Sequence, residues 1–212
     1  KFKKATWLII VKVIDVTLFY SYNRMKSVYE LGWEPQQCGL SVDAFHERNL
    51  DRKRNWPAGL LATSTHDTKR SEDVRARIVA ISEIPELWRR SLQRWHTVNR
   101  RCKRIVNDLE APDPNEEYLL YQTLLGTWSV QSSGRPENAA PPDYIERIQA
   151  YMAKTLHEAK IKTSWIQPNE EWDAAIRDFM AHILYSSRRH KFLPIFLPVT
   201  AMTERLGAIN VI

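Results

Sequence analysis

The chain has 212 residues, which is enough to bury a sizeable core as one domain. A complete (β/α)8 barrel needs roughly 250 residues, so the length excludes one. The net charge of +6 is compatible with nucleic acid or an anionic surface as a partner but requires neither.

The cysteines and the N-terminal apolar stretch indicate a compartment. Cys38 and Cys102 form neither a metal-binding spacing nor a disulfide framework, which fits a reducing cytoplasm. Lys12 and Asp15 interrupt the apolar stretch before it reaches the length of a membrane span, and no small-residue cleavage site follows it. We therefore predict a cytoplasmic protein that has no membrane partner, no metal and no cofactor.

The first predicted elements precede residue 50. Residues 5–14 are rich in Ile and Val and bounded by charge, which predicts a buried parallel strand. Residues 17–31 carry aromatic and apolar side chains at helical spacing, and Gly32 ends the pattern. Ser41 is a suitable N-cap for a second helix that runs through Asn49.

The most informative stretch lies at residues 60–82. An apolar, β-branched run at residues 60–65 predicts a strand that ends in His66 and Asp67. A helix over residues 71–82 follows behind Ser71, with acidic residues in its first turn. A strand that presents polar side chains at its C-terminal end is typical of the catalytic face of an α/β barrel.

The remaining sequence predicts mostly helix. A helix that opens at Pro85 carries a core-facing stripe that includes Trp88 and Trp95. Further helices are predicted over residues 116–128, 143–161 and 169–186. Residues 129–142, rich in Ser, Gly, Asn and Pro, form the best linker candidate. Pro194 and Pro198 are predicted to break the tail into short pieces.

Several stretches carry a resemblance to a known family. The string ATSTHDTKRSEDVRAR is similar to the fourth conserved region of maltooligosyltrehalose synthases, a family of the α-amylase superfamily (glycoside hydrolase family 13). The segments FYSYNRMKSVYELG, FHERN, YIERIQAYMAKTLHEAKIKTSWIQPNEEW and FLPVTAMTERLGAIN continue the likeness, which covers nearly the whole chain after about Lys12. Around Lys12 the family pattern is Lys-Gly-Val-Glu-Asp-Thr, and here only the lysine and Thr17 match it.

The resemblance implies a fold class and a domain organisation. We expect a mainly α protein in which a helical domain is attached to a partial (β/α)8-barrel segment with few strands, truncated at both ends. The expected parts are a barrel segment with the His-Asp motif at residues 1–70, a helical insertion domain at 71–190, and a return towards the barrel at 191–212. The remainder of the catalytic barrel is then a partner of this chain.

The resemblance also implies roles for four residues. Asp67 matches the carboxylate that stabilises the distorted sugar ring, and His66 matches the neighbour that hydrogen-bonds the same sugar. Lys69 resembles the lysine that grips the glucose beyond the cleavage point, and Lys12 stands at a comparable place for the same subsite. An isolated His-Asp pair would more simply satisfy a strand end, so the surrounding motif carries the functional interpretation.

Other residues near the motif are interpreted as structural. The motif residues Arg70, Glu72 and Asp73 are expected to form an ion network at the start of the helix. The flanking aromatic residues are expected to pack in the core rather than stack on sugar: Tyr20, Tyr22, Phe45 and Trp56.

The implied parent enzyme is an intramolecular glucosyl transferase. It converts the reducing-end α-1,4 bond of a maltooligosaccharide into an α,α-1,1 bond by double displacement, with an Asp nucleophile and a Glu acid/base upstream of this segment. We expect the isolated chain to be inactive because two of the three carboxylates are missing. A plain amylase or trehalohydrolase is disfavoured, since Thr-Lys-Arg-Ser-Glu-Asp follows His-Asp.

The alternative hypothesis is a basic helical binding module for nucleic acid or protein, without catalysis. The feature that suggests it is a run of basic side chains: Arg89, Arg90, Arg94, Arg100, Arg101, Lys103 and Arg104. This run matches no recognition-helix, zinc-finger or RNA-binding signature, and arginines on a solvated helix face are common. We therefore predict no nucleic-acid partner.

Overall fold

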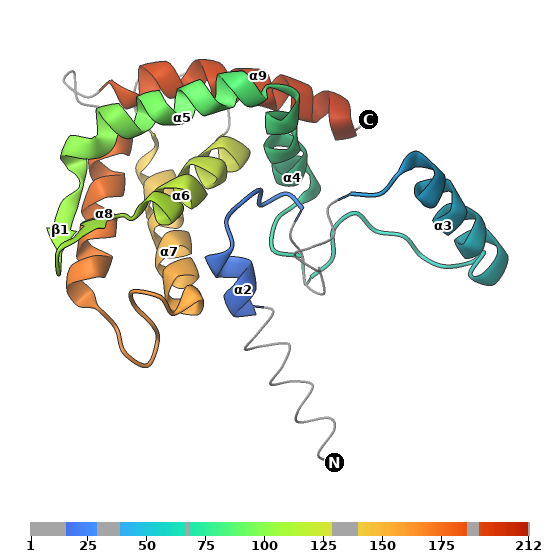
Figure 1. Ribbon diagram of the computed structural model, residues 1–212, viewed down its shortest axis with the longest axis horizontal. Coiled ribbons are helices and arrows are strands. Elements are labelled where there is room, and N and C mark those ends of the chain that lie inside the picture. Colours follow the sequence, from blue (N-terminus) through green and yellow to red (C-terminus); the bar gives the residue numbers. More distant parts are fainter. Residues whose placement is uncertain (1–15, 29–38, 67, 129–139, 186–190, 212) are drawn as a thin grey trace, which may run out of the picture.

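The computed structural model describes residues 16–28, 39–66, 68–128, 140–185 and 191–211, and within them the chain is mainly helical, as predicted (Figure 1). Two short 3₁₀ turns, Ala80–Glu83 and Arg100–Cys102, flank the helix Pro85–Asn99. In chain order the elements are α2 (Val16–Ser21), α3 (Val42–Asn55), α4 (Glu72–Val79), α5 (Pro85–Asn99), β1 (Arg104–Val106), β2 (Leu109–Ala111), α6 (Pro114–Thr127), α7 (Pro142–Ala159), α8 (Glu170–Leu184) and α9 (Phe192–Val211).

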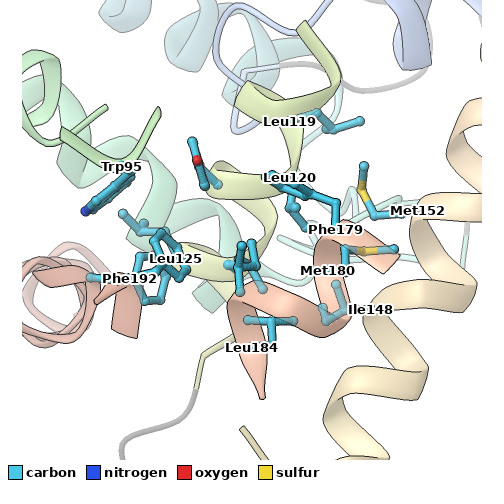
Figure 2. Close-up of a cluster of buried hydrophobic side chains, with 14 of the residues drawn as sticks. Trp95, Leu119, Leu120, Leu125, Ile148, Met152, Phe179, Met180, Leu184 and Phe192 are labelled. Atoms are coloured by element: carbon cyan, nitrogen blue, oxygen red, sulfur yellow. The ribbon is translucent and has the colours of Figure 1, made fainter. Parts of the chain in front are cut away.

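The core is centred on Trp95 of α5, which is fully buried. Helices α5 and α9 lie side by side across one end of the bundle (Figure 1). The Trp95 ring makes edge contacts with Tyr121, Phe192 and Phe196 at centroid distances of 5.3 to 6.0 Å. Figure 2 shows how side chains from α5, α6, α7, α8 and α9 meet in this cluster. Edge-on aromatic pairs add stability beyond the apolar area that they bury.

Helix α6 runs through the middle of the bundle and is buried on almost every side. Its start is fixed by a capping box, in which an Asp113 Oδ1 accepts from the Glu116 amide and Glu116 Oε2 accepts from the Asp113 amide, both at 2.9 Å. A cap of this kind satisfies backbone donors that the first turn leaves without partners. The cap explains why the helix begins at Pro114, two residues before the predicted start.

The predicted helix over residues 17–31 is much shorter in the structure and ends at Ser21. Side chains of α6 take up the backbone groups that a longer helix would have used. Gln122 accepts from the Lys26 amide at 2.8 Å and donates to the Asn23 carbonyl at 3.0 Å, while the Tyr118 hydroxyl donates to the Arg24 carbonyl at 2.8 Å. Tertiary hydrogen bonds therefore override the helical periodicity of this segment.

The strand predicted at residues 60–65 is not formed: among the described residues the sheet consists of β1 and β2 alone. Residues 60–65 are irregular and exposed. A strand needs a neighbour for its backbone hydrogen bonds, and the part of the chain that the structure describes offers none at this place. The strand predicted at residues 5–14 and most of the linker predicted at 129–142 lie outside the described residues.

The sequence interpretation missed the hairpin of β1 and β2, which pair antiparallel with Val106 opposite Leu109. Asn107 and Asp108 form the turn with φ of 50° and 63°. Asn and Asp tolerate the left-handed region, and two such residues in succession form the hairpin turn that matches the twist of the strands. This dipeptide was the available signal.

The tail is a single helix, α9, rather than the short pieces predicted from its prolines. Pro194 falls in the first turn, where its missing amide costs nothing, and Pro198 is accommodated inside the helix. The apolar face that includes Phe192 and Phe196 is held by the core. Among the described residues, α9 is also the one helix that is long and apolar enough to cross a membrane. Its Glu204 side chain forms an ion pair with Arg77 of α4 at 3.0 Å.

Two glycines permit close approach to α4. A Cβ at Gly126 of α6 would lie 2.8 Å from a Val74 methyl, and a Cβ at Gly207 of α9 would lie 2.9 Å from the Arg77 amide nitrogen. The second contact is with backbone, which has less freedom to move than a side chain. Gly207 therefore fixes the distance between α9 and α4.

We predict that Gly207→Ala lowers the free energy of unfolding by about 1–3 kcal/mol, because the added methyl group overpacks the contact with α4. An alanine at an unobstructed helical position would instead raise stability by roughly 0.5–1 kcal/mol. Urea unfolding measures the change, and Ala208→Gly on the exposed neighbouring position is the control for helix propensity. A stabilised Gly207→Ala variant would contradict this packing.

Candidate functional site

The segment that carries the His-Asp motif is closed by a short hydrogen-bonded turn around an exposed His66. The Thr68 amide donates to the Thr65 carbonyl at 3.2 Å, and the Thr68 hydroxyl donates to the same carbonyl at 2.8 Å. The Thr65 amide in turn donates to the Thr68 hydroxyl at 3.2 Å. Three bonds between these two threonines hold His66 on the surface, where a solute can reach it.

The same segment is attached to helix α4 on its N-terminal side. The Thr63 hydroxyl donates to Glu72, and the Thr63 carbonyl accepts from the Arg75 guanidinium. Ser71 precedes α4 with an extended backbone, but its side chain makes no capping bond to the helix amides. Its hydroxyl instead binds Asp73, and this hydrogen bond lowers the pKa of the Asp73 carboxyl.

On its C-terminal side the segment is attached to the helical body by Arg70. This side chain is buried, and its Nη2 donates to the Tyr151 hydroxyl of α7 at 2.6 Å. The guanidinium also lies over the rings of Phe19 and Tyr151, at 5.8 and 5.7 Å from their centroids. The prediction that Arg70 forms an ion network with Glu72 and Asp73 is therefore wrong for Arg70, because its side chain faces α2 and α7.

A buried lysine, Lys26, lies beside Arg70. Its ammonium nitrogen lies 4.8 Å from the centroid of the Phe19 ring and donates to the carbonyls of Phe19 and Tyr22, the latter at 3.1 Å. Burial, together with the positive charge of Arg70, lowers the pKa of Lys26 from 10.5 to about 6. The lysine is therefore mostly neutral at pH 7 and can serve as a hydrogen-bond donor without a full buried charge.

The structure places two of the four predicted site residues. His66 is exposed and Lys69 is partly buried on the same short segment. Asp67 and Lys12 lie outside the described residues, so their predicted roles stay predictions. Among the residues that the structure describes, no group of three or more His, Cys, Asp or Glu side chains is arranged to hold a metal ion.

The packing role predicted for the flanking aromatic residues is right for Tyr20, which is buried, and wrong for Phe45 and Trp56. Phe45 is 54% exposed and Trp56 is 72% exposed. Trp56 lines an open hollow of about 470 Å³ at the end of α3. The other lining residues are Arg48, Asp51, Arg52, Gly59, Leu60 and Leu61. Helix α3 has no buried residue, so these side chains cannot reach a core within the described chain.

Five of the seven side chains in the basic run form ion pairs within the protein: Arg89, Arg90, Arg100, Lys103 and Arg104. The Lys103 side chain is 2% exposed and binds Glu117 at 2.8 Å, and Arg104 binds Asp178 at 3.1 Å. Arg89 and Arg90 both bind Glu86 at 2.8 Å. These contacts favour the interpretation of the run as a structural, solvated face.

Comparison with known proteins identifies relatives over most of the chain. No family model matches it. Two curated Mycobacterium tuberculosis proteins, from strains CDC 1551 and H37Rv and named as maltooligosyl trehalose synthases, are each 33% identical over 173 residues, which is 82% of this chain. A Sulfolobus tokodaii structure titled as a hypothetical maltooligosyl trehalose synthase superposes with a TM-score of 0.79 at 33% identity over 98% of this chain.

The chain belongs to the maltooligosyl trehalose synthase family. A second maltooligosyl trehalose synthase structure has a TM-score of 0.83 at 31% identity over 99% of this chain, and an Arthrobacter ramosus synthase has 0.76 at 28% over 97%. The chain spans 20% of the length of the curated relatives and about a quarter of the solved structures, in their C-terminal part. The family resemblance expected from the motif is confirmed.

Sequence analysis did not identify the residues that hold the motif segment of this synthase relative. Tyr151 lies 81 positions beyond Arg70, and nothing in the local pattern of either residue indicates the contact. Lys26 lies in a stretch whose aromatic and apolar periodicity predicted a helix, and that pattern gave no sign that this lysine would be buried. Thr63, Thr65 and Thr68 offered a weak signal, because threonine hydroxyls often bond to backbone in turns.

We predict that Lys26→Met abolishes a rise in stability above pH 6. Lys26 titrates near 10.5 in the unfolded chain and near 6 in the folded one, so the folded state binds fewer protons between these values. Stability therefore increases with pH across this window, by up to about 1.4 kcal/mol per pH unit. Urea unfolding at pH 5 to 9 measures the slope, and Lys53→Met on the exposed helix α3 is the control.

Glu116 provides the opposite dependence. Burial raises the pKa of this carboxyl from 4.5 to about 7, so the folded state holds the extra proton and stability falls as pH rises between these values. Glu116→Gln should remove this fall and keep the rise that depends on Lys26. If Lys26→Met and the wild-type chain have parallel stability curves above pH 7, the lysine is charged in the folded state and our account of it is wrong.

Proposed function

We propose that this chain is part of a (1→4)-α-D-glucan 1-α-D-glucosylmutase, which converts the reducing-end α-1,4 bond of a maltooligosaccharide into an α,α-1,1 bond. The product is maltooligosyltrehalose, a step in trehalose biosynthesis. The observation that carries the proposal is 33% identity to proteins named as maltooligosyl trehalose synthases over 82% of the chain. Because the chain is about a fifth of their length, the activity is proposed for the longer protein that contains it.

The proposed chemistry is a double displacement through a covalent glycosyl-enzyme intermediate. Such a reaction needs a nucleophilic carboxylate and an acid/base carboxylate, which we assign to strands outside this chain. We assign Asp67 to a third carboxylate role, in which it binds sugar hydroxyls and stabilises the distorted ring. His66 then donates to the same sugar, and its exposed position on the closed Thr65–Thr68 turn supports this role.

The proposed role of Lys69, and of Lys12, is to retain the glucose that is released in the first step. That glucose must stay bound, turn, and attack through its anomeric hydroxyl before water does. An ammonium group donates to several hydroxyls without a fixed planar geometry, which suits a sugar that has to rotate. Lys69 lies on the same short segment as His66, so both can face one sugar-binding site.

The proposed organisation comprises a barrel segment at residues 1–70, a helical domain at 71–190 and a return towards the barrel at 191–212. Leu60 and Leu61 are exposed, and so is Trp56, next to an α3 that buries nothing. Contiguous exposed apolar side chains usually mark a surface that another segment covers. We assign that cover to the remainder of the catalytic barrel, and the site of action to the cytoplasm.

The basic helical binding module is not favoured as a second function. Such a module needs a free basic face, whereas several basic side chains of the run each bind a carboxylate within 3.1 Å: Lys103, Arg104, Arg89 and Arg90. A paired arginine or lysine offers less positive potential to a nucleic-acid phosphate.

We predict that a chimaera of the Mycobacterium tuberculosis relative, with its matched 173 residues replaced by those of this chain, makes a non-reducing product from maltopentaose. The 212-residue chain alone should make none, because it lacks the nucleophile and the acid/base. Asp67→Asn should lower kcat of the chimaera by about 10³-fold, since several kcal/mol of transition-state stabilisation depend on that carboxylate. Chromatography of the products measures both quantities.

The partition of products tests the lysine. Lys69→Met should raise the share of free glucose relative to the α,α-1,1 product, because the released glucose escapes and water takes its place. Lys53→Met, an exposed lysine on α3, should leave this share unchanged. A folded chimaera that lacks activity, or turnover by the isolated chain, would refute the proposed function.

A further inference from the structure

Arg70 is buried although its hydrogen-bonding capacity is not fully used. Its Nη1 is buried and finds no hydrogen-bond partner in the structure. Lys26 lies close enough to be affected by its charge. A buried guanidinium with an unused donor costs free energy, and hydrophobic residues often replace such groups without loss of stability.

An arginine supplies geometry that an aliphatic residue of similar length does not. Its planar fork points Nη2 at the Tyr151 hydroxyl at 2.6 Å, while its face lies over the rings of Phe19 and Tyr151. Three contacts from two helices fix both the position and the plane of the group. The consequence is a defined backbone position at residue 70, immediately after Lys69.

The backbone position at residue 70 also constrains the exposed end of the motif segment, at His66. Lys69 is the direct neighbour of Arg70, and Thr68 is joined to Thr65 by the three hydrogen bonds that close the turn around His66. On the other side, Thr63 is fixed to Glu72 and Arg75 at the start of α4. The segment is thus attached at both ends, to α4 at one end and to α2 and α7 at the other.

We propose that Arg70 is a positioning residue that holds Lys69 and His66 at the sugar-binding site through its bond to Tyr151 on helix α7. The inference deepens the proposed function and rests on it for the roles of these two residues. It assigns a task to the helical body: α7 supplies the hydroxyl that sets where the substrate-binding side chains stand. Arg70 itself does not touch the substrate.

Hydrogen exchange in the 212-residue chain tests the tether, by which we mean the Arg70–Tyr151 contact, and it needs no enzymatic activity. Arg70→Met and Tyr151→Phe should each make the Thr68 and Lys69 amides exchange roughly tenfold faster, with the core amides of α7 unchanged. Arg147→Met and Tyr144→Phe are matched controls on the same helix, because Arg147 lies over the Tyr144 ring at 5.9 Å and the Tyr144 hydroxyl bonds to Thr127 at 2.9 Å. Neither control contacts the motif segment.

Kinetics of the chimaera test the consequence. Arg70→Met should lower kcat by roughly 10²-fold, since misplacement of a substrate-binding group by about 1 Å has an effect of this size. Tyr151→Phe should lower kcat about tenfold, and should have no further effect in the Arg70→Met background, because both changes remove the same contact. Arg70→Lys keeps the charge and should recover only part of kcat, since it lacks the fork.

The outcomes separate the two proposals. Faster exchange at Thr68 in an inactive chimaera would support the tether and refute the function. An active chimaera whose kcat is unchanged by Tyr151→Phe, or whose loss of kcat is the same in Tyr144→Phe, would refute the positioning role. Additive losses for Arg70→Met and Tyr151→Phe would also refute it. If Arg70→Met does not fold, Tyr151→Phe, which removes one hydroxyl, decides alone.

Discussion

The enclosure of helix α6 is the constraint on which the other elements depend. A helix that is buried all round must find partners for each of its polar side chains, because an unpaired buried group is costly. Glu116 accepts from the Trp172 ring of α8 at 3.1 Å, and Glu117 binds His96 and Lys103 on the other flank, both at 2.8 Å. Gln122 holds the chain that leaves α2. The polar residues of one helix thus place three of its neighbours.

The same logic extends from α6 to the motif segment. Because Gln122 fixes the Asn23 and Lys26 backbone, α2 is held in place, and Phe19 of α2 lies under the Arg70 guanidinium. Arg70 completes the connection to α7 through Tyr151. The position of the exposed His66 therefore depends on a buried amide more than 50 residues further along the chain. Binding groups that sit on a surface segment need such a rigid support to keep their geometry.

Sequence analysis could predict the parts of this fold that depend on local chemistry. The caps Ser41 and Asn169 and the proline at position 85 are local signals, and the helices that they mark are found. Errors arose where distant contacts decide the outcome. The helix predicted to start at Thr17 ends at Ser21, because Gln122 binds the Asn23 and Lys26 backbone. Helix α9 continues through Pro198 because the core holds its apolar face. The Arg70–Tyr151 contact joins residues far apart in sequence, so no local pattern could show it.

Two buried titratable groups, Lys26 and Glu116, lie next to these connections. Burial moves the pKa values of Lys26 and Glu116 towards the neutral form, so keeping either group charged inside the fold costs free energy. Both remain because each donates or accepts a hydrogen bond that an apolar group cannot make: Lys26 to the end of α2, and Glu116 to the cap of α6 and to α8. Fully satisfied buried polar contacts of this kind favour one arrangement of the surrounding elements, and here that arrangement supports the exposed motif segment.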